Sequence, residues 1–169
     1  MKTARKQFWS DLKSGVFVSM VKETAKGEAL NNPREVYNTL KPLFAEHDDV
    51  ECLYGIFLNS KNRILAIDKL ASGSIGSSVI YPREVVKMML RHKAVALILA
   101  HNHPSGNPDP STEDRALTCR IYAALKAIDA TLLDHMIVGD GYYSFADEGL
   151  IETIKEHHHN HIMKGGPYV

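Results

Sequence analysis

Five segments of the chain carry the hydrophobic pattern of β-strands. They are 15–22, 51–58, 63–68, 94–100 and 131–138. In the first segment Val16, Val18 and Met20 fall at every second position, which is the period of a strand with one buried face. Polar residues join the second and third segments, so we expect a β-hairpin there. The fourth, AVALILA, is apolar throughout and predicts a central strand whose sheet has helices on both faces.

Apolar residues at helical spacing indicate three helices among these strands. The helices are expected to begin near Pro33, Tyr81 and Ser111. Pro42 should end or kink the first helix, and the Gly- and Ser-rich stretch 71–78 indicates a connecting loop. The second helix should face the core with Val85, Val86, Met89 and Leu90. Elements in this order predict an α/β fold, a three-layer domain with a central mixed β-sheet flanked by helices.

Composition and charge narrow the class of protein. With 169 residues, of which 44% are apolar, the chain is long enough for one domain around a single core. Its 20 basic and 20 acidic residues cancel, so the charge does not support binding to nucleic acid. No run approaches the roughly 20 apolar residues of a membrane span, and the basic start lacks the apolar core of a signal peptide. We therefore expect a cytoplasmic protein.

The domain organisation predicted from these patterns has three parts. Residues 1–14 form a basic tail, 15–155 form the folded domain, and 156–169 form a His-rich tail. Four tail histidines could hold a metal ion, but such a terminal cluster is typical of disordered or accidental sequence. They are His157, His158, His159 and His161.

The cysteines and two isolated histidines carry no motif. Cys52 and Cys119 lack the CxxC spacing of a redox pair or a zinc knot, so we expect both to be small buried residues. His47 and His92 are expected at the surface. None of these four side chains is a candidate for chemistry.

The segment HNHPSGNPDPSTED, which follows the predicted central strand, has the pattern of a metal site. Side chains at positions i and i+2 of a strand point the same way, so His101 and His103 can converge on one ion. Ser111 is expected to cap the next helix, which brings Asp114 in its first turn back beside the histidines. Two histidines and one aspartate leave the fourth tetrahedral position open, as in a catalytic zinc site.

A hydrolytic zinc site also needs a carboxylate that accepts and returns a proton. Glu51, at the start of a neighbouring strand, is the expected residue, and Glu84 is the alternative. Ser111 could donate a hydrogen bond to an oxyanion, could serve only as the helix cap, or could do both.

These residues resemble a known signature. Glu51, the His101-x-His103 pair, Ser111 and Asp114 match the JAMM motif of the JAB/MPN metalloproteases, and HNHPSG is similar to the RadC branch of that family. Three flanking regions are also similar to that branch. They are Gly73–Glu84, Thr118 and Asp134–Ser144.

The resemblance implies a fold and an activity. The fold is the JAB/MPN domain, whose layered core is related to that of cytidine deaminases. The implied cofactor is one catalytic Zn²⁺ ion held by His101, His103 and Asp114, with Glu51 as acid and base and Ser111 as oxyanion support. The implied reaction is hydrolysis of a peptide or isopeptide bond in a peptide or protein substrate that the resemblance does not identify. Asp134 and His135 are expected to be structural hydrogen-bonding partners rather than ligands.

Two other classes of function are alternatives to hydrolysis. A nucleic-acid enzyme is disfavoured, since zinc deaminases require an H-x-E motif with a P-C-x-x-C partner, which this chain lacks. A non-catalytic binding module, with a retained metal site and a link to DNA repair or mobile elements, is the alternative function. Longer RadC-like proteins have a helix-hairpin-helix region ahead of the JAB domain, for which this chain is too short, and this weakens any inherited DNA role. The oligomeric state is not indicated by the sequence.

Overall fold

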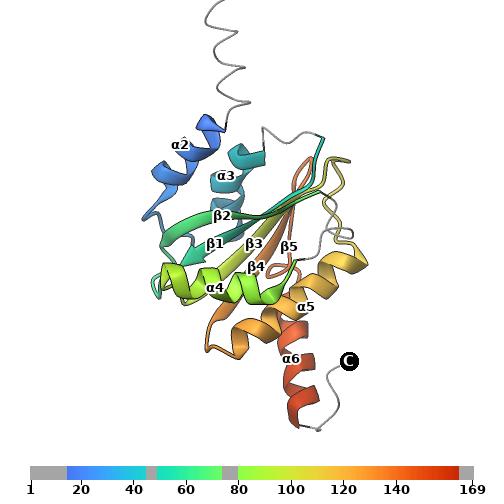
Figure 1. Ribbon diagram of the computed structural model, residues 1–169. Helices are drawn as coiled ribbons and strands as arrows, with labels where there is room; N and C mark the ends of the chain where they lie inside the picture. Colours follow the sequence, from blue (N-terminus) through green and yellow to red (C-terminus); the bar gives the residue numbers. More distant parts are fainter. Residues whose placement is uncertain (1–14, 45–48, 74–79, 164–169) are drawn as a thin grey trace, which may run out of the picture.

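A five-stranded mixed β-sheet forms the middle layer of the molecule (Figure 1). The computed structural model describes residues 15–44, 49–73 and 80–163. The strands lie in the order β2-β1-β3-β4-β5, with β3 and β4 parallel and the other neighbours antiparallel. Their bounds are β1 Cys52–Leu58, β2 Ile64–Ser72, β3 Ala96–Asn102, β4 Thr131–Val138 and β5 Tyr142–Ser144. The predicted hairpin and central strand are thereby confirmed.

Helices cover both faces of this sheet (Figure 1). On one face lie α2 Val16–Ala25 and α3 Pro33–Phe44. On the other face lie α4 Pro82–His92, α5 Thr112–Lys126 and α6 Leu150–Met163. The predicted three-layer α/β architecture is confirmed.

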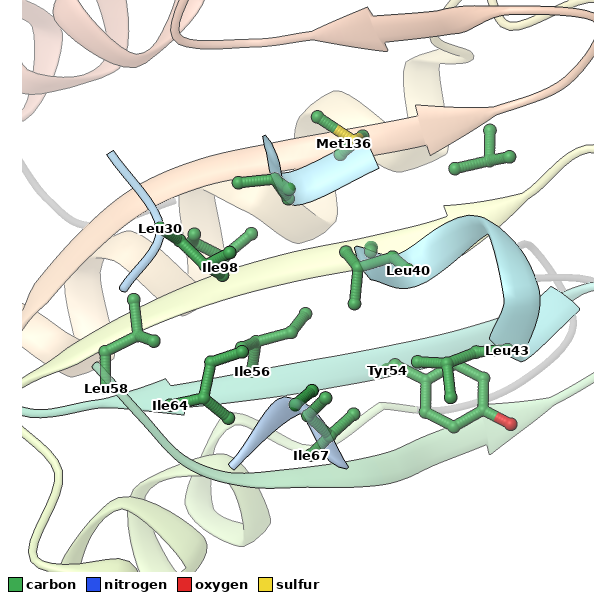
Figure 2. Close-up of a cluster of buried hydrophobic side chains, with 14 of the residues drawn as sticks. Leu30, Leu40, Leu43, Tyr54, Ile56, Leu58, Ile64, Ile67, Ile98 and Met136 are labelled. Carbon is green, nitrogen blue, oxygen red and sulfur yellow. The ribbon is translucent and has the colours of Figure 1, made fainter. Parts of the chain in front are cut away.

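The strand period of two divides the buried side chains between two cores. Tyr54, Ile56 and Leu58 of β1 point toward α2 and α3, where they meet Leu40 and Leu43. Figure 2 shows this cluster, to which β3 adds Ile98 and β4 adds Met136. All of these labelled side chains are almost fully withdrawn from solvent, so this face of the sheet is dry.

The opposite core lies under α4, α5 and α6. Leu53 and Phe57 of β1 and Leu97 and Leu99 of β3 point to this side. The helices supply the residues that cover them, which are Val85, Met89, Leu117, Ile121, Leu125 and Ile151. Because both faces are covered, every residue of β3 is buried, and side chains beyond Leu99 on this face continue directly toward α5.

The predicted N-terminal strand 15–22 is wrong, because Val16–Ala25 is the helix α2. Val18, Val21 and Ala25 recur at helical spacing and pack on the first core. Val16 and Met20, which created the apparent alternation, are 48% and 60% exposed. Short apolar runs fit both periods, and here the helical spacing determined the structure.

Two boundaries differ from the predicted ones. Of the two outcomes expected at Pro42, the end of the helix is wrong, because α3 continues for two residues past Pro42 and ends at Phe44. The strand β2 runs to Ser72, so it takes the first residues of the predicted 71–78 loop, and the rest of that stretch lies outside the described residues. Extra length in β2 keeps it paired with all of β1, since Cys52 is opposite Ser72.

Several predicted side-chain environments are also corrected. Leu90 is 65% exposed, because Val85 and Met89 define the inward face of α4. Cys52 is buried as expected, but Cys119 is exposed on the outer side of α5. His92 is half-buried, with its ring against Phe57 and its Nε2 bonded to Asp68 Oδ2, so it is not a free surface residue. His47 lies outside the described residues.

The helix α6 passes through the boundary expected between the domain and the His-rich tail. It runs to Met163, so the expected disorder is wrong for 156–163. The N-terminal tail 1–14 lies outside the described residues, and the division of the chain into parts stays a prediction. Among the helices of the described segments, none combines the length and the apolar character that crossing a bilayer requires.

Candidate metal centre

The end of β3 brings two imidazoles together. His101 is the sixth residue of the seven in this strand and pairs with Leu53 of β1 and Ile137 of β4. His103 follows the strand, and its backbone N–H donates to the carbonyl of Val138 over 2.8 Å. As a result, His101 Nε2 and His103 Nε2 lie 2.9 Å apart.

The first turn of α5 places a carboxylate beside both rings. Ser111 is the N-cap of this helix, and its Oγ accepts a hydrogen bond from Asp114 N over 3.1 Å. Asp114 completes a capping box, because its Oδ2 accepts from Ser111 N at 2.8 Å and from Ser111 Oγ at 2.7 Å. The same carboxylate lies 3.2 Å from His101 Nε2 through Oδ1 and 3.5 Å from His103 Nε2 through Oδ2.

Glu51, which directly precedes β1, is the second carboxylate at this point. Its Oε1 lies 3.6 Å from His103 Nε2 and 3.9 Å from His101 Nε2. Its carbonyl accepts a hydrogen bond from Gly73 N over 2.8 Å, which fixes its backbone against the end of β2. Glu84, the alternative from the sequence, is on α4 with its side chain 53% exposed and close to Arg83 and Lys87. Glu51 and not Glu84 is therefore beside the histidines.

The four side chains have the spacing of a ligand set. Glu51, His101, His103 and Asp114 each offer one atom, and these atoms lie within 4.8 Å of one another. A tetrahedral zinc ion with bonds of about 2.0–2.1 Å separates its ligands by about 3.3 Å. The distances of 2.9, 3.2 and 3.5 Å among the histidines and Asp114 are close to that value. Two imidazole nitrogens and a carboxylate oxygen are ligands that zinc accepts, so the residues fit the ion.

The electrostatics of the site favour a negative charge on Asp114. Burial opposes ionisation of this carboxyl, but hydrogen bonds from His101, His103 and Ser111 hold its pKa well below the ordinary value. The hydrogen bond to Asp114 raises the pKa of His103 above 6.5 although burial acts in the opposite direction. Without a metal ion, the carboxylate and a His103 proton therefore stabilise each other.

His135, on β4, contacts His101 from the side opposite to the ligand cluster. Its Nε2 lies 2.9 Å from His101 Nδ1, and its Nδ1 lies 2.7 Å from Thr118 Oγ1. Thr118 Oγ1 in turn donates to the carbonyl of Asp114 over 2.6 Å. His135 is fully buried and its ring stacks on Phe145. Burial lowers the pKa of His135 well below 6.5, and the neighbouring His101 acts in the same direction, so the ring is neutral.

Asp134, beside His135 in the sequence, is a structural partner as expected. Its carboxylate accepts hydrogen bonds from His135 N, Ser144 Oγ and Ala146 N. Burial raises the pKa of Asp134, and these three donors counteract the rise. The side chain faces the core under α2 and α3 and joins β4 to the turn after β5.

Asn102 was missed by the sequence analysis as a functional residue. Its Oδ1 accepts from Cys52 N over 2.8 Å, and its Nδ2 donates to the carbonyl of Val50 over 3.1 Å. These two backbone groups lie on either side of Glu51. The side chain between the two histidines of the motif therefore holds the backbone that carries the second carboxylate. An asparagine at a strand end, between the two histidines of the motif, is the only sequence signal for this contact.

The loop after His103 is packed tightly against the turn between β4 and β5. Gly106 has a φ of 83°, and its carbonyl accepts from Asp140 N over 2.8 Å. A Cβ on Gly139 would lie 2.2 Å from the same Gly106 carbonyl oxygen. Only glycine at 139 allows this close approach, which fixes the loop that joins the histidines to α5.

Comparison with known proteins agrees with this arrangement. The protein-family description that matches the sequence is that of the RadC-like JAB domain, over residues 30–150. The chain belongs to the RadC-like JAB domain family. The match includes all five strands and the four clustered side chains.

Several curated relatives of this RadC-like JAB chain have the name UPF0758 protein. The one from Pseudomonas fluorescens is 50% identical over 113 residues, which are 67% of this chain and 50% of the relative. Another, from Symbiobacterium thermophilum, is 45% identical over 123 residues, or 72% and 52% of the two chains. A third, from Thioalkalivibrio sulfidiphilus, is 42% identical over 127 residues, or 75% and 56%. The chain spans about half the length of these curated relatives.

Proposed function

We propose that this RadC-like JAB domain is a zinc-dependent metallohydrolase that cleaves a peptide or isopeptide bond in a peptide or protein substrate. The observation that carries the proposal is the set of two imidazoles and a buried carboxylate at metal-ligand spacing, with a second carboxylate beside it. A structural zinc site needs no second carboxylate, whereas hydrolysis does. Nucleic acid is not proposed as the substrate, because the chain has no net positive charge.

His101, His103 and Asp114 would hold the ion, and Glu51 would remain outside the ligand set. When bound, zinc lowers the pKa of a coordinated water to about 7 and polarises a carbonyl oxygen. Asp114 is suited to this role because it is ionised, and its Oδ2 is already fixed by the cap of α5. Burial of His101 and Asp114 excludes bulk water from that side of the site.

Glu51 would transfer the protons. Its carboxylate accepts the proton of the attacking water while the water oxygen forms a bond to the carbonyl carbon of the substrate. The C–N bond then breaks, and Glu51 delivers the proton to the leaving nitrogen, so the products are a carboxylate and an amine. The distance of 3.6 Å between Glu51 Oε1 and His103 Nε2 supports this assignment, because it places the base at the ligand cluster.

Ser111 would assist at the carbonyl oxygen. In the structure its hydroxyl donates to Asp114 Oδ2, and its backbone N–H donates to the same oxygen. In the proposed mechanism the O–H turns toward the oxyanion, while the N–H bond keeps Asp114 in place.

The test compares the zinc-loaded protein with its Glu51→Gln variant on a defined library of peptides and lysine-linked isopeptides, with new termini read by mass spectrometry. We expect cleavage by the wild-type chain and a loss on the order of 10²–10⁴-fold in the variant. Zinc content should stay at about one ion per chain in both, because the three ligands are unchanged. In both proteins the tail histidines are replaced by asparagine, so that zinc held by the tail does not enter the count.

Three outcomes separate the alternatives. Persistent cleavage by Glu51→Gln removes Glu51 from the mechanism. Loss of zinc from that variant makes Glu51 a fourth ligand, which closes the site. Zinc binding without cleavage in the wild-type chain supports the non-catalytic binding module instead.

A further inference from the structure

A relay of three consecutive hydrogen bonds connects the two proposed ligands His101 and Asp114 on the side away from the cluster. It runs from His101 Nδ1 to His135 Nε2, from His135 Nδ1 to Thr118 Oγ1, and from Thr118 Oγ1 to the carbonyl of Asp114. His101, Thr118 and His135 have no exposed surface, and none of the three distances exceeds 2.9 Å. The relay joins three elements, β3, β4 and α5, whose residues are far apart in the sequence.

The direction of every hydrogen bond in this relay follows from its last member, the carbonyl of Asp114. A carbonyl oxygen only accepts, so the single hydroxyl proton of Thr118 is committed to Asp114. Thr118 can then contribute only a lone pair to His135, which makes His135 Nδ1 the protonated nitrogen. A neutral imidazole has one N–H, so His135 Nε2 has a lone pair and accepts from His101 Nδ1. When a metal ion replaces the proton through which His101 Nε2 contacts Asp114 in the metal-free site, His101 keeps only its Nδ1 proton and presents the Nε2 lone pair to the ligand cluster.

We propose that Thr118 and His135 are positioning residues that lock His101 in the tautomer able to bind a metal ion through Nε2. This inference rests on the proposed metal centre and adds the means by which one of its ligands is prepared. Because Thr118 is one turn after Asp114 on α5, the same bonds also tie the helix that supplies the carboxylate to the strand that supplies the imidazole.

His103 provides an internal comparison. Its Nδ1 lies 2.7 Å from the carbonyl of Asn107, which fixes its tautomer directly. At His101 the partner is another imidazole, which can accept only in one of its two tautomers. Thr118 is therefore needed for His101, whereas a backbone carbonyl is sufficient for His103.

The first test measures zinc affinity by competition with a chromophoric chelator, without any substrate. Thr118→Val and His135→Phe should bind zinc about 10–100-fold more weakly than the wild-type chain. Thr118→Ser restores the hydroxyl and should bind zinc as the wild type does. Ser144→Ala is the matched control, because it removes a buried hydroxyl from the neighbouring Asp134 and does not touch the relay. Its zinc affinity should be unchanged even where its free energy of unfolding falls.

The second test reads the tautomers of the zinc-loaded protein from ¹⁵N resonances of the imidazole rings. We expect His101 and His135 to be protonated at Nδ1 only, and Thr118→Val to move the His135 proton to Nε2. A wild-type His135 with a protonated Nε2 would overturn the inference, as would wild-type zinc affinity in both Thr118→Val and His135→Phe. Failure of the hydrolase proposal would give a different result: the protein would bind zinc with the relay intact and would cleave no peptide.

Discussion

Asn102 shows how one side chain can serve a site without facing it. It is 6% exposed and bonded to the backbone on both sides of Glu51. The side-chain amide of Asn102 thus takes the place of a main-chain partner for two backbone groups at the start of β1. The middle residue of the HNH sequence thus organises the carboxylate of Glu51, while the outer two supply imidazoles to the cluster that could hold a metal ion.

Replacement of Asn102 by alanine should separate these two tasks. The partly buried carbonyl of Val50 and the buried N–H of Cys52 lose their partner, which should cost about 1–3 kcal/mol of unfolding free energy. Glu51 would be displaced, so hydrolysis should fall on the order of 100-fold while zinc affinity stays near that of the wild type. Urea titration, peptide cleavage and chelator competition measure the three quantities.

Asn59→Ala is the control for this prediction. Asn59 Oδ1 accepts from Lys61 N and Arg63 N at the far end of β1, so it stabilises the backbone in the same way but away from the site. The variant should lose stability and keep its hydrolytic rate. Equal losses of rate in both variants would show that Asn102 acts only through stability.

Zinc affinity should depend on pH through His103. Asp114 stays ionised because its pKa is held well below the ordinary range, so it does not exchange a proton on binding. The pKa of His103 is raised above 6.5 by its hydrogen bond to Asp114, and zinc binds only the unprotonated ring. Affinity should therefore fall as the pH falls through this raised pKa, approaching about tenfold per pH unit for one proton.

Chelator competition between about pH 6 and pH 8 checks this dependence. The decline should already be visible above 6.5, the ordinary pKa of histidine. An affinity that is constant down to that pH would contradict the assigned role of the Asp114 contact. In Ser111→Ala, where Asp114 loses one donor but keeps both histidines, the decline should remain.

The cluster of His101, His103 and Asp114 could be predicted from local spacing, whereas the contacts that support it could not. The i and i+2 positions at a strand end and a helix cap three residues before an aspartate are short-range patterns. Thr118 and His135 are 17 residues apart, and Asn102 lies about 50 residues from its backbone partners. Contacts of that separation depend on strand order, which a single sequence does not specify.

At the scale of elements, the site depends on how β3, α5 and the β4–β5 turn meet. The loop that joins β3 to α5 rests on Gly139 and Asp140, so its path is set by close backbone packing. That path determines where α5 starts and hence where Asp114 lies. The position of Asp114 is therefore sensitive to the conformation of the turn between β4 and β5.

The Gly139→Ala variant tests this dependence. Its Cβ would meet the backbone oxygen of Gly106 at 2.2 Å, which side-chain rotation cannot relieve. We expect a loss of about 1–3 kcal/mol or more in unfolding free energy together with weaker zinc binding. Gly141→Ala is the matched control, because a Cβ there meets nothing within 4 Å. It should change the unfolding free energy by less than about 0.5 kcal/mol.

The elements predicted best were those with a long or one-sided pattern. The unbroken apolar run of β3 and the helical spacing in α4 and α5 left one interpretation. The helix α2 was misassigned because Val16, Val18 and Met20 also fit the strand period, and only tertiary packing selected Val18 and Val21 as the inner residues. Exposure of Cys119 has the same origin, since a small apolar residue can occupy either side of α5.

At the scale of the whole molecule, two hydrophobic cores pack against opposite faces of the central sheet. Leu99 lies in the core under α4 and α5 and is fully buried two residues before His101. Leu99→Ala should lower the unfolding free energy by about 2–5 kcal/mol, because it leaves a cavity under the helices. Leu90→Ala, on the exposed side of α4, should change it by less than about 0.5 kcal/mol. Urea titration of both variants measures the difference, and equal values would contradict the assigned faces of α4.

The central place of β3 has a consequence for how the protein would lose a bound metal ion on heating. This strand is hydrogen-bonded to β1 and β4 at its two edges and covered on both faces. Amides in such a strand exchange with solvent only through global opening, whereas terminal helices fray at low cost. A molecule in which α2 or α6 has melted would therefore still retain zinc, and release of the ion would coincide with the cooperative collapse of the fold.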